Sequence, residues 1–143
     1  MRDIVPDTQF SDVDFPAGTR ARMPNGIAVV IGIESYRHTA AAPHALNDAE
    51  IFREYLLKRF GYERQNVLLR LDEQTTKGEF ERIFGSDGWL ARQVTAKSEV
   101  PVFYAGHGAP DPGTGSAFLV PYDTDPNYPA TGFALSELYE RLD

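Results

Sequence analysis

The feature of this chain that most constrains its fold is the apolar run GIAVVIGI at residues 26–33. The run is continuous rather than alternating and is rich in Val and Ile, which favours a strand buried on both faces. A strand of this kind needs a layer of helices on each side. The run therefore predicts a parallel sheet at the centre of an α/β domain.

The segments that follow this strand supply helices and further strands in alternation. The expected elements are helix 46–61, strand 66–72, a short helix after Thr76, a helical piece at 89–94, strand 99–106, a short strand at 116–121 and helix 135–142. In the first helix Phe60 extends the apolar face and Gly61 is a stop. Thr76 and Glu79 have the spacing of a capping box. This order is typical of an open, mainly parallel sheet.

Composition restricts the function classes. A length of 143 residues fits one domain, with residues 1–25 as a proline-containing leader or linker and 26–143 as the folded part. The net charge of −7 argues against a nucleic-acid partner. Since there is no apolar run near 18 residues and no signal-peptide core, we expect no membrane contact and a cytoplasmic protein. The 143 residues contain no cysteine and therefore no thiol nucleophile.

The stretch VPVFYAGHGAP at 100–110 places a histidine between two glycines, directly after a predicted strand. In parallel sheets the chemistry is found past the carboxyl ends of the strands, so His107 lies where a catalytic group is expected. Histidine is suited to general base catalysis near neutral pH, and the Gly108 amide can face an oxyanion without an intervening side chain. The same pattern also fits an ordinary loop residue.

Four blocks of the sequence, in this order and spacing, resemble the caspase-like cysteine peptidases. They are AVVIGIESY, ALNDAE, VFYAGHGAP and FLVPYD, and the resemblance extends over residues 26–143. It is closest to the bacterial, metacaspase-like branch. The resemblance implies a caspase-like three-layer α/β/α sandwich with a mainly parallel sheet.

The resemblance also implies roles for three residues. His107 matches the histidine that activates a cysteine thiolate and protonates the leaving amine, and Gly108 matches the glycine whose amide forms half of the oxyanion hole. Asp48 matches the aspartate that lines the pocket for Arg or Lys before the scissile bond. Asp48 is also suited to complement the dipole of its helix, and the two roles are compatible.

The family's cysteine lies on a strand that follows the helix seen here at 135–142. We therefore expect this chain to be the histidine-bearing part of an incomplete caspase-like domain, and to be inactive alone. The expected partners are a peptide or protein substrate and, at the edge of strand 100–105, either the remaining cysteine-bearing part of the domain or another copy of the chain.

Other functions remain open or have less support. Family calcium positions fall near Ala117, Ala134 and Leu135, which offer no side-chain oxygen, so we expect no metal, and no cofactor is expected. The alternative to a cysteine endopeptidase is a catalytically inactive caspase-like scaffold for binding or regulation. A receiver-like signalling domain would need clustered carboxylates after the first strand, and Glu34 alone does not supply them.

Overall fold

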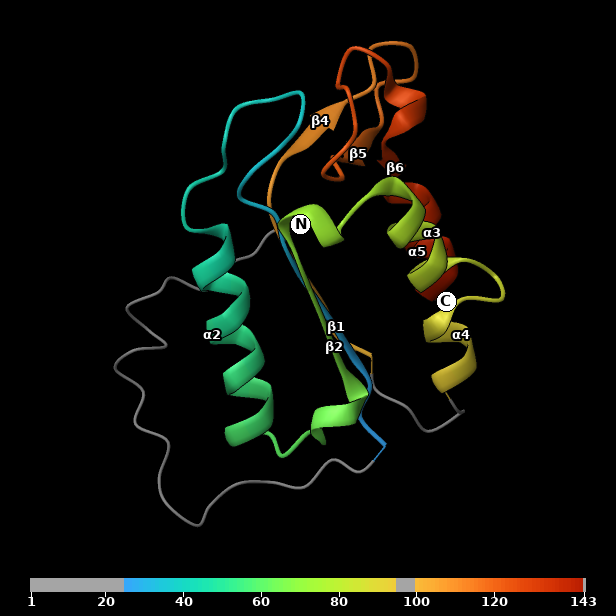
Figure 1. The fold of residues 1–143 in the computed structure, drawn as a ribbon. Helices are drawn as coiled ribbons and strands as arrows, with labels where there is room; N and C mark the ends of the chain where they lie inside the picture. The colour runs from blue at the N-terminus through green and yellow to red at the C-terminus, as the bar shows by residue number, and fades with distance from the viewer. Residues whose placement is uncertain (1–24, 95–99, 143) are drawn as a thin grey trace.

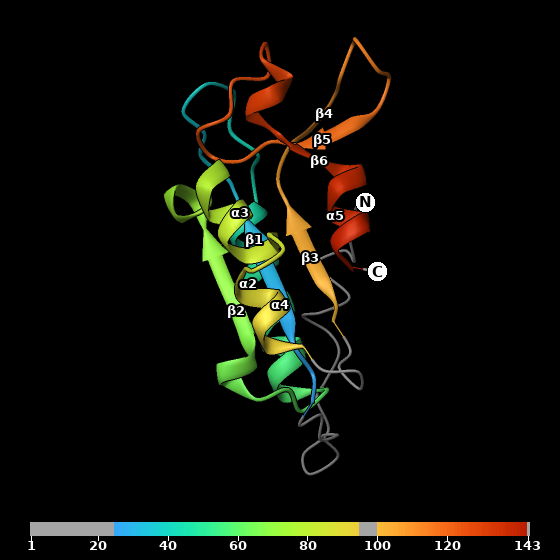
Figure 2. The ribbon, with the colours of Figure 1, turned by 90° about the vertical axis from the view of Figure 1, so that its right-hand side faces the viewer.

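The computed structural model describes residues 25–94 and 100–142 and has a parallel sheet at its centre (Figure 1). The sheet contains β1 (Ala28–Gly32), β2 (Val67–Leu71) and β3 (Val102–Ala105). The strand order is β2-β1-β3 and both pairings are parallel, so β1 is the central strand (Figure 2). The predicted α/β fold with a mainly parallel sheet is thereby confirmed.

Helices cover both faces of this sheet. Figure 1 shows α2 (Ala45–Lys58) on one face, and α3 (Lys77–Phe84), α4 (Trp89–Gln93) and α5 (Leu135–Leu142) on the other. The result is the three-layer arrangement that the apolar strand at 26–33 requires.

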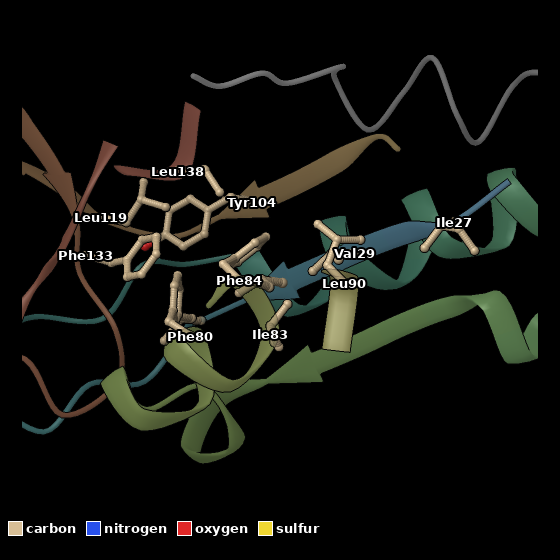
Figure 3. Close-up of a cluster of buried hydrophobic side chains, with 12 residues drawn as sticks. Ile27, Val29, Phe80, Ile83, Phe84, Leu90, Tyr104, Leu119, Phe133 and Leu138 are labelled. Atoms are coloured by element: carbon tan, nitrogen blue, oxygen red, sulfur yellow. The ribbon is translucent and has the colours of Figure 1, made fainter. Parts of the chain in front are cut away.

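The burial of β1 on both faces gives the protein two apolar clusters. Ala28 and Val30 pack with side chains of α2, whereas Val29 and Ile31 point to the opposite face. The second cluster, drawn in Figure 3, also contains Phe80, Ile83, Phe84 and Leu90. Complete burial of a side chain of this size contributes about 1.5–3 kcal/mol, so β1 is the structural centre of the domain.

The first helix is shorter than predicted at its carboxyl end. It ends at Lys58 rather than near residue 61, and Gly61 follows with a φ of 72°, a conformation that favours glycine. Phe60 was expected on the buried face, and this is wrong, because Phe60 lies beyond the last helical turn and is 41% exposed.

The predicted cap of α3 forms, with one difference. The Thr76 hydroxyl accepts a hydrogen bond from the Glu79 amide at 3.2 Å. The Glu79 carboxylate accepts hydrogen bonds from Arg70 and Arg82, at 2.8 and 2.6 Å. The side chain that would complete a capping box thus links β2 to α3 instead.

A second, antiparallel sheet lies beyond the carboxyl end of β3 (Figure 2). It contains β4 (Gly108–Pro110), β5 (Ala117–Leu119) and β6 (Phe133–Ala134) in the order β4-β5-β6. The sequence predicts β5 alone, because β5 lies within the predicted strand at 116–121, whereas β4 and β6 lie in no predicted strand. Three 3₁₀ turns complete the described elements: Arg64–Asn66, Asp72–Gln74 and Pro129–Thr131.

Two predictions fall on residues outside the described ranges. The leader predicted at 1–25 lies outside them except for Asn25, and residue 99 of the predicted third strand also lies outside. Within 25–94 and 100–142, no helix has the length and apolar character needed to cross a membrane.

Candidate active site

The backbone of His107 is held by two tyrosine hydroxyls just past the end of β3. Its N–H donates to the Tyr36 hydroxyl at 2.7 Å, and the Tyr104 hydroxyl donates to its carbonyl oxygen at 2.6 Å. Tyr36 comes from the loop after β1, and Tyr104 belongs to β3 itself. The amide of Val120 donates to the same carbonyl at 3.1 Å. His107 is therefore fixed from three separate segments of the chain.

The imidazole of His107 is oriented by a backbone carbonyl. Its Nε2 atom lies 2.9 Å from the carbonyl oxygen of Ala40, and its ring lies 4.9 Å from the Tyr36 ring, centroid to centroid. A carbonyl oxygen only accepts hydrogen bonds, so Nε2 carries a proton. In the neutral ring Nδ1 then has the free lone pair, which is the arrangement a general base requires.

Both tyrosine hydroxyls remain neutral near physiological pH. Burial raises the pKa of Tyr36 above its ordinary value of 10, partly offset by the hydrogen bond from the His107 backbone. Burial raises the pKa of Tyr104 well above the same value, and the neighbouring Tyr36 adds to the effect. Figure 3 shows the Tyr104 ring beside Leu119, Leu138 and Phe133. The two hydroxyls thus act as fixed hydrogen-bonding groups, not as charges.

Gly108 begins β4 with its amide directed away from β5. The carbonyl of His107 points toward the β5 side, where it accepts from Val120, the residue directly after β5, and successive residues of an antiparallel strand face opposite edges. A Cβ atom built on Gly108 would come no closer than 3.5 Å to any heavy atom, the nearest being the Phe118 carbonyl oxygen. The peptide plane of Gly108 is therefore accessible from outside the sheet.

Asp48 lies in the first turn of α2 and lines a cavity of about 660 Å³. The lining also includes Gly106 and Gly108, on either side of His107, and Ser116, directly before β5. The structure therefore brings Asp48 and Gly108 to one cavity, and His107 lies between two of its lining glycines. Asp48 is also placed to complement the dipole of α2, as the sequence allows.

The carboxylates of the loops around this site contact backbone amides. Asp111 accepts from Gly113 and Asp125 from Asn127, at 2.9 and 3.0 Å, as is typical of turns. Asp123 accepts from Lys77 at 2.9 Å and so caps α3. In the part of the chain that the structure describes, no group of three or more His, Cys, Asp or Glu side chains is placed to hold a metal ion.

Sequence reasoning missed three of the groups that contact His107. Tyr104 lies in the predicted strand with its ring buried, and its hydroxyl donates to the His107 carbonyl. Tyr36 lies in a loop 71 residues earlier in the chain. The Ala40 contact uses a backbone carbonyl, for which a sequence carries no signal. Of these three groups, only Tyr104 has a sequence signal, because it lies three residues before the expected catalytic histidine.

Comparison with known proteins agrees with this architecture. The family model of the caspase domain matches residues 25–143. The chain is 31% identical over 88 residues to metacaspase-1A of Aspergillus oryzae, and 27% identical over 90 residues to metacaspase-1 of Eremothecium gossypii. Each match covers 59% of this chain, but only 21% and 19% of the respective relative, so the chain spans about a fifth of their length.

These relatives are fungal and do not support the bacterial origin that the sequence blocks suggested. They do agree with the metacaspase-like character of those blocks. The match to the family model extends over most of the sequence, including every described strand and helix. The chain therefore belongs to the caspase domain family of cysteine peptidases.

Proposed function

We propose that this chain is the histidine-bearing part of a cysteine endopeptidase that uses a Cys-His dyad and cleaves after Arg or Lys. The observation that carries the proposal is the contact between His107 Nε2 and the Ala40 carbonyl, which leaves Nδ1 as the proton acceptor. The 143 residues contain no cysteine, so the nucleophile comes from a segment outside them.

The chemistry assigns a role to each residue of the site. His107 Nδ1 takes the thiol proton, and the thiolate attacks the carbonyl carbon of the scissile peptide. The Gly108 N–H donates a hydrogen bond to the oxyanion that forms. His107 then returns the proton to the departing amine, which leaves a thioester. A water molecule, deprotonated by His107, hydrolyses this thioester and frees the cysteine.

The proposed preference for Arg or Lys rests on the carboxylate of Asp48. Asp48 lines the same cavity as Gly108, so a side chain that enters the cavity beside the reacting carbonyl meets a negative charge. A guanidinium group forms strong, often bidentate hydrogen bonds with a carboxylate, and an ammonium group forms a single strong contact. An acidic substrate side chain would instead be repelled.

The alternative is a caspase-like scaffold without peptidase activity, which the lack of cysteine within the 143 residues favours. A scaffold has no chemical need for an oriented imidazole, whereas a peptidase does. The sequence encoded after Asp143 distinguishes the two. A block of the type Asp-x-Cys-x-Ser-Gly on the next strand supports the peptidase, and a stop codon or a block without cysteine supports the scaffold.

The test of the peptidase is hydrolysis of a fluorogenic peptide with Arg before the reporter group, by a form that includes the cysteine segment. His107→Ala is expected to abolish turnover, and His38→Ala, which changes an exposed loop histidine, is the matched control. Residues 1–143 alone are expected to give only the hydrolysis rate of the buffer. Turnover by the cysteine-bearing form that survives His107→Ala would refute the assignment.

A further inference from the structure

The loop of residues 34–44 carries two groups that reach His107 from another part of the chain. The hydroxyl of Tyr36 accepts from the His107 amide, and the carbonyl of Ala40 contacts Nε2. Both contacts are below 3 Å, where a small displacement of the loop breaks a hydrogen bond. The residues that hold this loop therefore control the orientation of the imidazole.

Asp72 holds the beginning of the loop through its side chain. Its Oδ1 atom accepts from the backbone amides of Glu34 and Ser35, at 2.9 and 3.0 Å. These two amides immediately precede Tyr36 in the chain. Asp72 follows the last residue of β2. Its carboxylate therefore connects the end of β2 to the loop that leaves the neighbouring strand, β1.

The backbone of Asp72 adopts a conformation that few residue types accept. Its φ is 48°, in the left-handed region, where Asp and Asn are among the tolerated non-glycine residues. The turn is closed by Thr75, whose amide donates to the Asp72 carbonyl at 2.8 Å and whose hydroxyl donates to the same oxygen. The structure therefore keeps a costly backbone conformation at a position where it aims a carboxylate at the loop.

The same turn holds the loop on the other side of Tyr36. The Thr75 carbonyl accepts from the Tyr122 amide at 2.8 Å, and the Tyr122 carbonyl accepts from the Arg37 amide at 3.1 Å. The guanidinium of Arg37 lies over the Tyr122 ring, 5.6 Å from its centroid. Tyr36 is thus bracketed by two anchors, at residues 34–35 and at Arg37, that both depend on the turn at 72–75.

We propose that Asp72 is a positioning residue for His107, acting through the loop that carries Tyr36 and Ala40. The proposal rests on the proposed function in one respect only, because that function gives the orientation of the His107 imidazole a catalytic purpose. The physical dependence of His107 on Asp72 can be measured in the chain without any peptidase activity.

The test compares Asp72→Gly and Asp72→Asn by NMR of the full chain. Glycine accepts the positive φ but removes the carboxylate, whereas asparagine accepts the φ and keeps a neutral acceptor oxygen. Exchange of the His107 amide is expected to be about tenfold faster in Asp72→Gly and about threefold faster in Asp72→Asn, since charged acceptors form the stronger bonds. The preference of the His107 ring for the Nε2–H tautomer is expected to fall more in Asp72→Gly than in Asp72→Asn.

Two controls separate positioning from general destabilisation. Asp125→Ala removes a carboxylate that likewise accepts a backbone amide, that of Asn127, but takes part in neither anchor of the loop. It is expected to leave the exchange and tautomer of His107 unchanged. The chain has three histidines, and His38 and His44 are exposed. In the same spectrum, their tautomers serve as the reference for rings without the Ala40 contact.

The proposal is overturned if Asp72→Gly folds with wild-type exchange and tautomer at His107, or if Asp125→Ala changes them equally. If Asp72→Gly does not fold, Asp72→Asn decides alone, and an unchanged His107 refutes the proposal. In a cysteine-bearing form, Asp72→Gly is expected to lower kcat more than it changes KM. If His107→Ala leaves turnover intact while the NMR result holds, the proposed function fails and the positioning relation stands.

Discussion

The two glycines beside His107 should respond differently to the addition of one methyl group. A Cβ atom on Gly106 would lie 2.6 Å from the Tyr36 hydroxyl and 3.0 Å from the Tyr104 hydroxyl. On Gly108 the nearest atom would be at 3.5 Å, an ordinary contact. Neither glycine has a positive φ, so steric contact and not backbone strain distinguishes Gly106→Ala from Gly108→Ala.

The cost of Gly106→Ala follows from what the Tyr36 hydroxyl does. That hydroxyl would have to retreat by about 0.8 Å to restore a contact of 3.4 Å. The movement lengthens its 2.7 Å hydrogen bond with the His107 amide beyond the normal range. Leaving a partly buried donor without its acceptor costs about 1–3 kcal/mol. Gly108→Ala has no such penalty and gains a few tenths of a kcal/mol, up to about 1, by restricting the unfolded chain.

Urea unfolding followed by circular dichroism measures both values, and His107 amide exchange shows where the loss arises. For Gly106→Ala we expect a lower midpoint with an unchanged slope, together with faster exchange at His107. For Gly108→Ala we expect a midpoint equal to or slightly above that of the wild type. Equal stabilities of the two variants, with equal protection of the His107 amide, would falsify the role of the Tyr36 and Tyr104 hydroxyls as a constraint on this segment.

Three further predictions follow from other parts of the structure. In a cysteine-bearing form, Asp48→Ala should lower kcat/KM for Arg peptides while reducing stability by no more than about 1 kcal/mol through the lost helix-dipole interaction, and equal or better cleavage after Asp would contradict the specificity. The hydrogen bond from Arg82 lowers the pKa of Glu79 from its ordinary 4.5; Arg70 adds to this effect and partial burial opposes it. The contribution of Glu79 to the stability of the fold is therefore present above pH 4.5 and is lost as the pH falls through the lower pKa of the folded state. Because Arg82 is half exposed, Glu79→Gln should cost only ~1 kcal/mol at pH 7 and flatten the stability profile below pH 4.5, and a profile parallel to that of the wild type would argue against this. Finally, β3 pairs with β1 on one edge, and among the described residues no strand pairs with its other edge. We expect residues 1–143 to associate through that edge, and a strict monomer in sedimentation with a fully protected β3 would count against it.

The fold could be predicted from sequence wherever burial dictates the residue pattern. The continuous apolar run at 26–33 specifies β1 and its two helix layers, because only apolar residues are stable on both faces. The cap at Thr76 is a local interaction and was also predicted correctly. By contrast, β4 and β6 are two or three residues long, and their pairing with β5 depends on contacts that no local pattern encodes.

The surroundings of His107 were less predictable for a related reason. The histidine itself is indicated by its place after an apolar strand, but the groups that orient it are remote in sequence. Tyr36 is 71 residues away, and the Ala40 contact is made by a carbonyl that every residue type has. Asp72 was predicted only as the end of a strand, because its role depends on a carboxylate aimed at two backbone amides.

These remote groups meet because parallel strands end in a row. In the register of the sheet, Gly32 of β1 lies opposite both Leu71 of β2 and Ala105 of β3. The next residues therefore leave the sheet at one edge: Asp72 from β2, the loop with Tyr36 and Ala40 from β1, and the His107 segment from β3. A shift of one residue in either pairing moves a strand end by about 3.3 Å, more than a hydrogen bond tolerates. The strand register, which the buried core enforces, thus determines whether Tyr36 and Ala40 can hold the imidazole of His107 in place.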